Sequence, residues 1–363
     1  MNTKISWWRT SFGEKEIQRI ADSIRNECVS QGKVTAQFER YLANILEVDH
    51  VIAVSNGSIA LLMSLMAVGV VPGDEVILPN RTWIATAHAV HLLGARVILV
   101  DVEPDRPIID TGKIETRITS KTKGIIPVHM NGRSADMPKI RDIAERHSLF
   151  VIEDAAQALG SKNQFGFLGT QSEIGCFSLS MAKTIATGQG GFAVTNNIDL
   201  AERMRAIRTH GVENVKDPEC WAIPGFNFRF TDIQASIGIE QLKLLPEKID
   251  RLKEIYQQYL GGLASIPALK SIPVNLETGE VPMYNEFLCE QRGKLIKHLD
   301  SQGIETRPFF PDLNHADYLN QGSFEYPNSR KYGENGIYLP SGPAQNNEGI
   351  SRVIECIERA YTR

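Results

Sequence analysis

Short apolar segments alternate with amphipathic segments between residues 51 and 195, and this alternation limits the fold more than any other feature of the sequence. Several of the apolar segments contain no polar residue at all. Strands of this kind are typical of parallel sheets, because helices cover both faces of such a sheet. The expected strands are Val51–Val54, Glu75–Leu78, Arg96–Val100, Gly124–Val128, Leu149–Ile152, Gly175–Phe177 and Gly191–Val194.

The segments between these strands have helical periodicity, most clearly at Ser58–Val68, Ile84–Leu93 and Asp136–His147. Strands that alternate with helices predict an α/β fold with a mostly parallel central sheet. A further helix is expected near the N-terminus, where residues 11–14 have the form of a capping box. Its apolar face would carry Ile17, Ile20, Ala21 and Ile24.

The pattern changes after residue 230. Two consecutive helices are expected, Asp232–Leu244 and a second one that starts or bends at Pro246. Beyond a proline-containing stretch, the remainder has the pattern of a small α+β domain that ends in a helix near Gly349–Ala360. We therefore expect an N-terminal segment and a large α/β domain in residues 1–245. A linking helix and a small C-terminal α+β domain would occupy residues 246–363.

Composition excludes several classes of protein. The net charge of −4 does not indicate a basic surface for nucleic acid. No apolar run reaches the roughly 18 residues that a membrane-spanning helix needs, and the N-terminus lacks the apolar core of a signal peptide. The cysteines are far apart and form no CxxC pair, which favours reduced thiols and a cytoplasmic location. They are Cys28, Cys176, Cys220, Cys289 and Cys356.

A metal site is not expected. His88 and His91 are three residues apart on a predicted helix, but no third ligand follows at a suitable spacing.

Ligands of open α/β sheets bind beyond the carboxyl ends of the strands, and Lys183 occurs at such a place. It lies between the apolar strand Gly175–Phe177 and the glycine-rich turn Gly188–Gly191. A lysine that is partly removed from water has a lowered pKa, and its amine is then free to form a Schiff base. The glycines would let the backbone pass close to a ligand.

Three other strand ends carry candidate residues. Asp154 follows Leu149–Ile152 and is either a helix cap or the partner of a protonated heterocycle nitrogen, which pyridoxal phosphate (PLP) requires. Gly57 and Ser58 begin a helix and form either a plain capping turn or a seat for a phosphate. Trp83 belongs either to the core or to the face of a planar cofactor.

These residues stand within longer segments that resemble the DegT/DnrJ/StrS family of PLP-dependent nucleotide-sugar aminotransferases, which have the aspartate-aminotransferase (type I) fold. The resemblance covers nearly the whole chain. The matching segments are VSQGKVTAQFE (29–39), AVSNGSIAL (53–61), GDEVILPNRTWIATAHAV (73–90), VIEDAAQALGS (151–161), FSLSMAKTIATGQGGFAVTNN (177–197), GFNFRFTDIQASIGIEQL (225–242), GIETRPFFP (303–311) and YLPSGP (338–343).

The resemblance implies a role for each candidate. Lys183 would hold PLP as a Schiff base and move protons, and Asp154 would pair with the pyridine nitrogen. The asparagine of the family that reaches the phosphate from the neighbouring subunit corresponds to Asn227, which implies a homodimer with shared active sites. The other implied cofactor contacts are Gly57, Ser58 and Ser178 at the phosphate, Trp83 stacked on the ring, and Gln157 near its phenolic oxygen.

Two details resemble the perosamine-synthase branch, namely the Asn56-Gly57 pair and the segment KTIATGQGG (183–191). Gln157 departs from that branch, which tends to have glutamate, and is typical of the wider family. The expected substrate is a nucleoside-diphosphate-linked 4-keto-6-deoxyhexose, with the GDP-sugar as first choice and L-glutamate as amino donor. Arg229 and Arg307 are candidates to bind the diphosphate, with His315 as a further polar contact, although each could instead be structural.

Two alternatives belong to different functional classes. In the PLP-dependent sugar dehydratases of this family, histidine occupies the position of Lys183, so the lysine disfavours that activity. A sensor or regulator that keeps the fold without catalysis would be expected to lose Lys183 or Asp154, and both are present.

Overall fold

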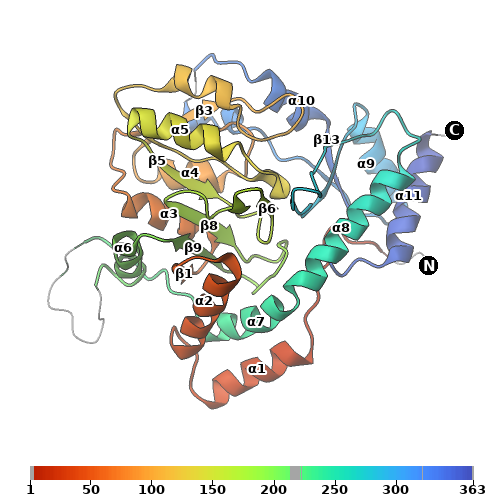
Figure 1. Ribbon diagram of the computed structural model, residues 1–363. Helices are drawn as coiled ribbons and strands as arrows, with labels where there is room; N and C mark the ends of the chain where they lie inside the picture. The colour runs from red at the N-terminus through yellow and green to blue at the C-terminus, as the bar shows by residue number, and fades with distance from the viewer. Residues whose placement is uncertain (1–3, 213–220, 222, 321, 362–363) are drawn as a thin grey trace.

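The computed structural model describes residues 4–212, 221, 223–320 and 322–361 (Figure 1). The strands are β1 (His50–Val54), β2 (Glu75–Pro79), β3 (Arg96–Val100), β4 (Thr122–Ile125), β5 (Phe150–Asp154), β6 (Lys162–Asn163), β7 (Gly166–Phe167), β8 (Ile174–Ser178), β9 (Gly191–Thr195), β10 (Lys270–Ser271), β11 (Asn285–Leu288), β12 (Arg307–Pro308) and β13 (Gly336–Leu339). The α-helices are α1 (Glu14–Arg25), α2 (Lys33–Leu46), α3 (Gly57–Ala67), α4 (Ala85–His91), α5 (Met137–His147), α6 (Ile198–Arg208), α7 (Asp232–Lys243), α8 (Leu245–Gly262), α9 (Arg292–Ser301), α10 (Pro327–Asn335) and α11 (Asn347–Tyr361).

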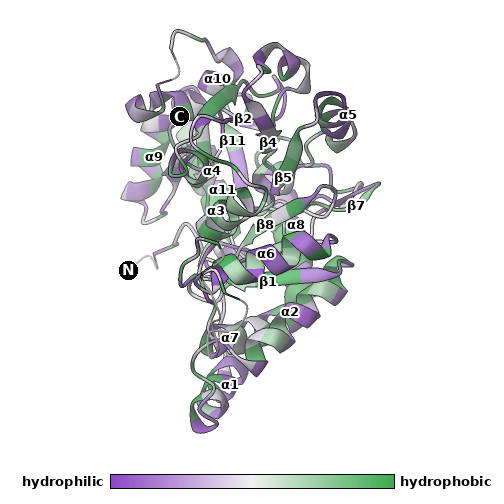
Figure 2. Cartoon of the chain, turned by 90° about the vertical axis from the view of Figure 1, so that its left-hand side faces the viewer, coloured by the Kyte–Doolittle hydropathy of each residue, from purple (hydrophilic) through white to green (hydrophobic). Residues whose placement is uncertain are grey.

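The largest sheet has the strand order β1-β9-β8-β5-β4-β2-β3. Neighbouring strands from β8 to β3 are parallel, and β9 runs antiparallel to both of its neighbours. Helices cover both faces of this sheet, and the first three residues of its central strand β5 are hydrophobic (Figure 2). The prediction of an α/β fold with a mostly parallel sheet is therefore confirmed.

Helices α7 and α8 follow one another end to end and connect the large sheet to a second sheet (Figure 1). Pro246 lies in the first turn of α8, where its missing N–H removes no helical hydrogen bond. The second sheet is antiparallel, with the order β10-β11-β13-β12, and packs against α8, α9 and α11. We propose that the two domains divide near residue 245. The N-terminal segment crosses this division, because Ile5 pairs with Ile304 and belongs to the core of the second sheet.

The predicted capping box was wrong, whereas the helix itself is present. The N-cap of α1 is Gly13 rather than Ser11, and the Glu16 carboxylate accepts a hydrogen bond from the Gly13 N–H at 2.9 Å. Ile17 and Ile24 are 58% and 56% exposed, so the expected apolar face is not buried within the described chain.

Strand β4 ends at Ile125, three residues earlier than expected. Pro127 follows and has no N–H to continue the ladder, although its carbonyl accepts a hydrogen bond from the Asp154 N–H. The hydrogen bonding to β5 continues at His129, whose N–H donates to the Asp154 carbonyl at 3.0 Å. The chain thus stays beside β5 beyond the end of the regular strand.

Asp232, the first residue of α7, caps α2 from across the fold. Gly32 supplies no side chain at the N-cap of α2, and the buried Asp232 carboxylate replaces it. The carboxylate accepts from the Gly32 N–H at 2.9 Å, the Thr35 N–H at 2.8 Å and the Thr35 hydroxyl at 2.7 Å. This interaction holds the first helices of the chain against α7.

We predict that Asp232→Ala lowers the free energy of unfolding by about 2–4 kcal/mol, because several buried donors lose a charged acceptor. Asp232→Asn is the matched control, since it keeps one acceptor oxygen and should lose less. Denaturant unfolding monitored by circular dichroism measures both. Equal stability of the alanine variant and the wild type would contradict the capping role.

Candidate active site

A cavity of about 590 Å³ lies beyond the carboxyl ends of β1, β2, β5 and β8. It is lined from both parts of the molecule, because residues of the second sheet and of the N-terminal segment form one wall. The predicted residues that line it are Gly57, Ser58, Trp83, Asp154, Gln157, Ser178, Lys183 and Arg307. Asn227, Arg229 and His315 were also predicted but do not line this cavity.

Asp154, the last residue of β5, is 5% exposed. Its Oδ2 accepts a hydrogen bond from the Thr86 hydroxyl at 2.7 Å, and its Oδ1 accepts from the Ala156 N–H at 3.1 Å. Burial raises the pKa of Asp154 above its ordinary value, while these hydrogen bonds and the charge of Lys183 oppose the rise. A cation placed against this carboxylate would therefore be held strongly.

Thr86 was missed by the sequence analysis. It lies in the first turn of α4, three residues after Trp83, and is fully buried. A threonine in a predicted helix has no local pattern that identifies it as the partner of a carboxylate 68 residues away.

Lys183 lies in a turn after β8 and is partly buried. Its backbone N–H donates to the Ser180 carbonyl at 3.2 Å. Burial lowers the pKa of Lys183 to about 8, and the negative charge of Asp154 opposes that shift. The amine is therefore largely available as a nucleophile and a proton acceptor in mildly alkaline solution, as the sequence position predicted.

The glycines after Lys183 are also required by the packing of the chain on itself. A Cβ on Gly191 would lie 2.5 Å from the backbone of Asn56 and of Gly57, and a Cβ on Gly190 would lie 2.6 Å from the Thr187 hydroxyl. Gly191 therefore allows the turn to pack against the protein's own backbone, and Gly190 allows it to pack against neighbouring side chains.

The N-terminus of α3 opens into the cavity. Asn56 is the N-cap and accepts from the Ile59 N–H at 2.9 Å, whereas the N–H groups of Gly57 and Ser58 have no acceptor within the helix. Ser178, at the end of β8, lies beside them, and a Cβ on Gly57 would be only 2.9 Å from the Ser178 Cβ. These N–H groups, the two hydroxyls and the helix dipole together form a seat for an anion.

Trp83 is 57% exposed and lines the cavity, so it is not a core residue. Phe310 meets it edge to face, with ring centroids 5.6 Å apart. Trp7, Tyr284 and Tyr338 complete the aromatic wall. The sequence analysis missed these four partners, because nothing in their local sequence distinguishes them from ordinary core aromatics.

Arg307 lies at this wall with its guanidinium 4.4 Å from the centre of the Trp7 ring. Arg229 instead donates from its Nε to the Asn227 Oδ1 at 2.8 Å, and Asn227 is exposed. His315 is exposed in a short 3-10 turn between residues 313 and 315. The cavity of a single chain therefore brings together only one of the three predicted substrate contacts.

The histidine pair on α4 faces an aromatic residue. The His88 Nε2 lies 2.6 Å from the Tyr318 hydroxyl, and the His91 ring lies 5.6 Å from the Tyr318 ring. Within the part of the chain that the structure describes, no three His, Cys, Asp or Glu side chains are grouped as metal ligands would be. A search of the same residues for a helix long and apolar enough to cross a membrane finds none.

Comparisons with known proteins place these features in a family. The model of the "DegT/DnrJ/EryC1/StrS aminotransferase family" matches residues 10–358. The chain is 36% identical over 338 residues to a GDP-perosamine synthase of Caulobacter vibrioides, with 91% of each chain covered. It is 33% identical over 348 residues to a dTDP-3-amino-3,4,6-trideoxy-alpha-D-glucose transaminase of Streptomyces venezuelae, with 94% of this chain and 90% of the relative covered.

A solved structure agrees with this assignment. The PLP form of Spr1654, a putative sugar aminotransferase from Streptococcus pneumoniae, superimposes with a TM-score of 0.93 at 25% identity and covers 99% of each chain. The type I fold that the motifs predicted is thereby confirmed.

The donor set of the cavity fits PLP. The buried Asp154 carboxylate suits a protonated ring nitrogen, the Lys183 amine suits an aldehyde, and the N-terminus of α3 suits a phosphate. Trp83 offers an exposed aromatic face within the same cavity. The residues present therefore match a planar, phosphorylated aldehyde with a basic nitrogen.

The lowered pKa of Lys183 predicts how the ligand-free protein takes up PLP. Only the unprotonated amine attacks an aldehyde, so the rate of covalent uptake should rise with pH and level off above a pKa of about 8. Stopped-flow absorbance measures the rate. Borohydride reduction followed by peptide mass spectrometry should place the label on Lys183, and Lys183→Ala is the control. A rate that keeps rising to the ordinary lysine pKa of 10.5 would contradict the burial argument.

Proposed function

The chain belongs to the DegT/DnrJ/EryC1/StrS aminotransferase family, and we propose that it transfers an amino group from L-glutamate to a keto group of a nucleoside-diphosphate-linked deoxysugar, with PLP as cofactor. The observation that carries the proposal is the presence of Lys183 and Asp154 in one cavity beside the anion seat at α3. The names of both relatives described above refer to nucleotide-linked amino sugars.

Each cavity residue has a distinct task in this reaction. Bound PLP supplies an electron sink for the carbon that loses its proton. Asp154 would hold the positive charge of the ring nitrogen. Lys183 Nζ would take the proton from the substrate carbon and return it at the carbon on the cofactor side. Gly57, Ser58 and Ser178 bind the phosphate. Trp83 would hold one face of the ring, and Gln157 would offer its side-chain amide to the phenolic oxygen.

The two alternative functions have less support. A dehydratase of this family would have histidine where Lys183 stands. A regulator without catalysis has no need for a lysine whose pKa is lowered beside a buried carboxylate. Both residues that the transamination requires are present and meet in one cavity.

The proposed acceptor is a GDP-linked 4-keto-6-deoxyhexose that is aminated at C4. Asn56-Gly57 and the segment 183–191 resemble perosamine synthases, and the Caulobacter relative is named as one. The Streptomyces relative is named for a dTDP sugar with a 3-amino group, which makes C3 amination the competing assignment. Arg307 is the guanidinium that this chain's own cavity offers to an anionic substrate group.

We predict that GDP-4-keto-6-deoxyhexose yields an amino sugar in the presence of glutamate, with higher kcat/KM than the dTDP- or UDP-linked sugars. Product formation followed by chromatography and mass spectrometry decides this. If the purified protein turns over only dTDP or UDP sugars, the GDP assignment is wrong and the aminotransferase activity stands. Turnover restricted to a 3-keto sugar would refute C4 amination.

We further propose that the enzyme is a cytoplasmic homodimer with shared active sites. Asn227 and Arg229 are cofactor and substrate candidates, yet they lie outside the cavity of their own chain. Several large apolar side chains are exposed on and around α1, as expected of a surface that another chain covers. They are Phe12, Ile17, Ile24 and Val29.

We predict that two inactive variants restore activity when they share a dimer. Lys183→Ala removes the lysine of one site, and Asn227→Ala removes the contact that its chain would donate to the other site. A verified heterodimer would contain one site with both residues intact, so about half of the wild-type activity should return. If purified heterodimers recover no activity, the active sites are not shared.

A further inference from the structure

Asn131 is a fully buried residue outside the cavity wall whose contacts reach the cavity on two sides. It follows β4 and has a left-handed backbone conformation, with φ 54° and ψ 37°. Its side chain pairs with the backbone of Tyr284 in both directions. The Asn131 Nδ2 donates to the Tyr284 carbonyl at 2.9 Å, and the Tyr284 N–H donates to the Asn131 Oδ1 at 2.6 Å.

The backbone of Asn131 determines how the Gln157 amide is oriented. The Asn131 N–H donates to the Gln157 Oε1 at 2.9 Å, and a backbone N–H cannot accept in return. The oxygen of the amide must therefore face Asn131, and its NH₂ group must face the other way. Gln157 is 9% exposed, lines the cavity, and its Nε2 has no hydrogen-bond partner among the described residues.

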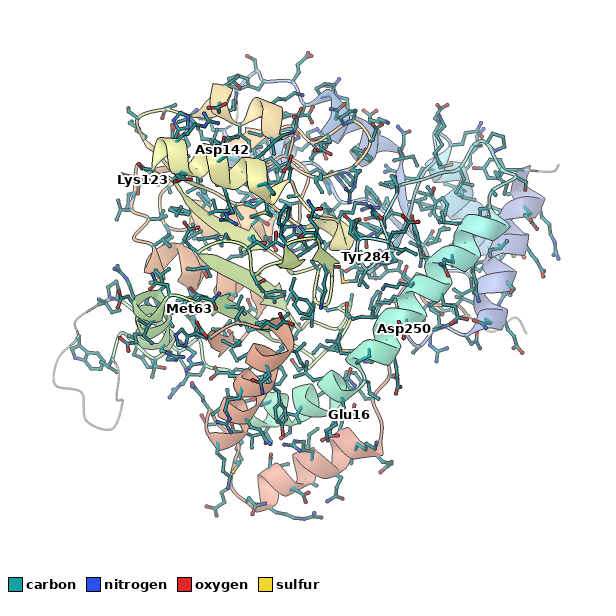
Figure 3. The ribbon with its side chains drawn as sticks, in the orientation of Figure 1. Glu16, Met63, Lys123, Asp142, Asp250 and Tyr284 are labelled. Atoms are coloured by element: carbon teal, nitrogen blue, oxygen red, sulfur yellow. The ribbon has the colours of Figure 1, made fainter. Side chains whose placement is uncertain are left out.

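Tyr284 connects the same unit to the lysine turn. Its hydroxyl donates to the carbonyl of Ala182, the residue before Lys183, at 2.9 Å. Burial raises the pKa of Tyr284, so the hydroxyl remains a donor throughout the neutral range. Its ring stacks on Trp7 with centroids 5.6 Å apart, and Figure 3 shows Tyr284 where the two parts of the molecule meet.

We propose that Asn131 and Tyr284 are positioning residues that hold Gln157 and the Lys183 turn as one hydrogen-bonded unit, and that Asn131 aims the Gln157 N–H donors at the phenolic oxygen of PLP. The inference rests on the cofactor part of the proposed function and not on the identity of the sugar. A donor at that oxygen stabilises its negative charge and weakens its hold on the proton of the nearby lysine–cofactor linkage. Gln157 thereby lowers the pH at which this proton leaves.

Asn131→Gly tests the arm that reaches Gln157. Glycine adopts the left-handed backbone of residue 131 without strain, so the variant removes only the two side-chain hydrogen bonds that anchor the segment to Tyr284. The N–H of residue 131 remains, but its segment is no longer fixed in place, so Gln157 is held less firmly in one orientation. The pH midpoint of the visible absorbance band of the holoenzyme should rise by roughly one unit, the size expected for one lost hydrogen bond to a charged group.

Three further variants make the result specific. Gln157→Ala should raise the midpoint by a similar amount, and Asn131→Gly added to it should produce no further rise if Asn131 acts through Gln157. Asn131→Asp keeps the acceptor for the Tyr284 N–H but sets a carboxylate oxygen against the Tyr284 carbonyl, so it breaks the same pairing by a second route if the glycine variant folds poorly. Ser161→Ala is the matched control. Ser161 accepts from the Val281 N–H at 3.0 Å, a buried bond between nearby segments, and its loss should leave the midpoint unchanged.

Tyr284→Phe tests the other arm, because it keeps the ring and the pairing with Asn131 but removes the bond to Ala182. The first-order rate of the glutamate half-reaction should fall several-fold, with an unchanged dissociation constant for glutamate, since only the placement of Lys183 is loosened. Together with a raised midpoint in Asn131→Gly, this result supports the proposal.

Three outcomes overturn it. An unshifted midpoint in fully loaded Asn131→Gly and Asn131→Asp, beside a normal wild-type band, overturns this inference alone. A wild-type band that does not change with pH also overturns this inference alone, whereas a wild-type protein that takes up PLP without any visible band overturns the cofactor part of the proposed function and the inference with it.

Discussion

The burial of the Asp154 carboxylate is the constraint on which the site depends. A buried carboxylate is costly unless donors and an opposite charge surround it. The Thr86 hydroxyl and the Ala156 N–H supply two hydrogen bonds, and the charge of Lys183 also opposes the rise in the pKa of Asp154. The same burial that raises the pKa of Asp154 lowers that of Lys183. One poorly hydrated cavity thus prepares both a partner for a cationic ring and a reactive amine.

The second part of the molecule closes this cavity and is joined to the first through buried ion pairs. Arg81, two residues before Trp83, donates to Asp312 at 2.7 Å, and Arg133 donates to Glu286 at 2.5 Å. All four side chains are almost completely buried. Removing one partner of such a pair leaves an uncompensated charge, so these contacts favour a single arrangement of the two parts. That arrangement brings the aromatic wall against the cofactor residues.

The parallel strands could be predicted from the sequence because their signal is local, whereas their order in the sheet came only from the structure. Each strand is a short apolar run, and the residue that follows it is placed at the same edge of the sheet as the others. The predicted cap of α1 was wrong because the helix begins two residues later, where Glu16 completes the cap at Gly13. The cap of α2 leaves no signal in the local sequence, because Asp232 supplies it from 200 residues away. Gly191 lets the turn after Lys183 meet the backbone of Asn56, a contact between distant segments that the local sequence does not show.

By itself the sequence determined the class of fold, the family and the identity of Lys183 and Asp154 as the central candidates, because each is recorded in contiguous segments of sequence, namely apolar strands, the residues that follow them and the family motifs. Only the tertiary structure decided which side chains complete the site. Thr86 meets Asp154, Asn131 orients Gln157, and Tyr284 reaches the carbonyl before Lys183. The residues that these contacts join are between 26 and 102 positions apart in the sequence. Periodicity reports only the burial of a face, whereas a hydrogen bond between distant segments depends on how whole elements pack, so it leaves no pattern in the local sequence.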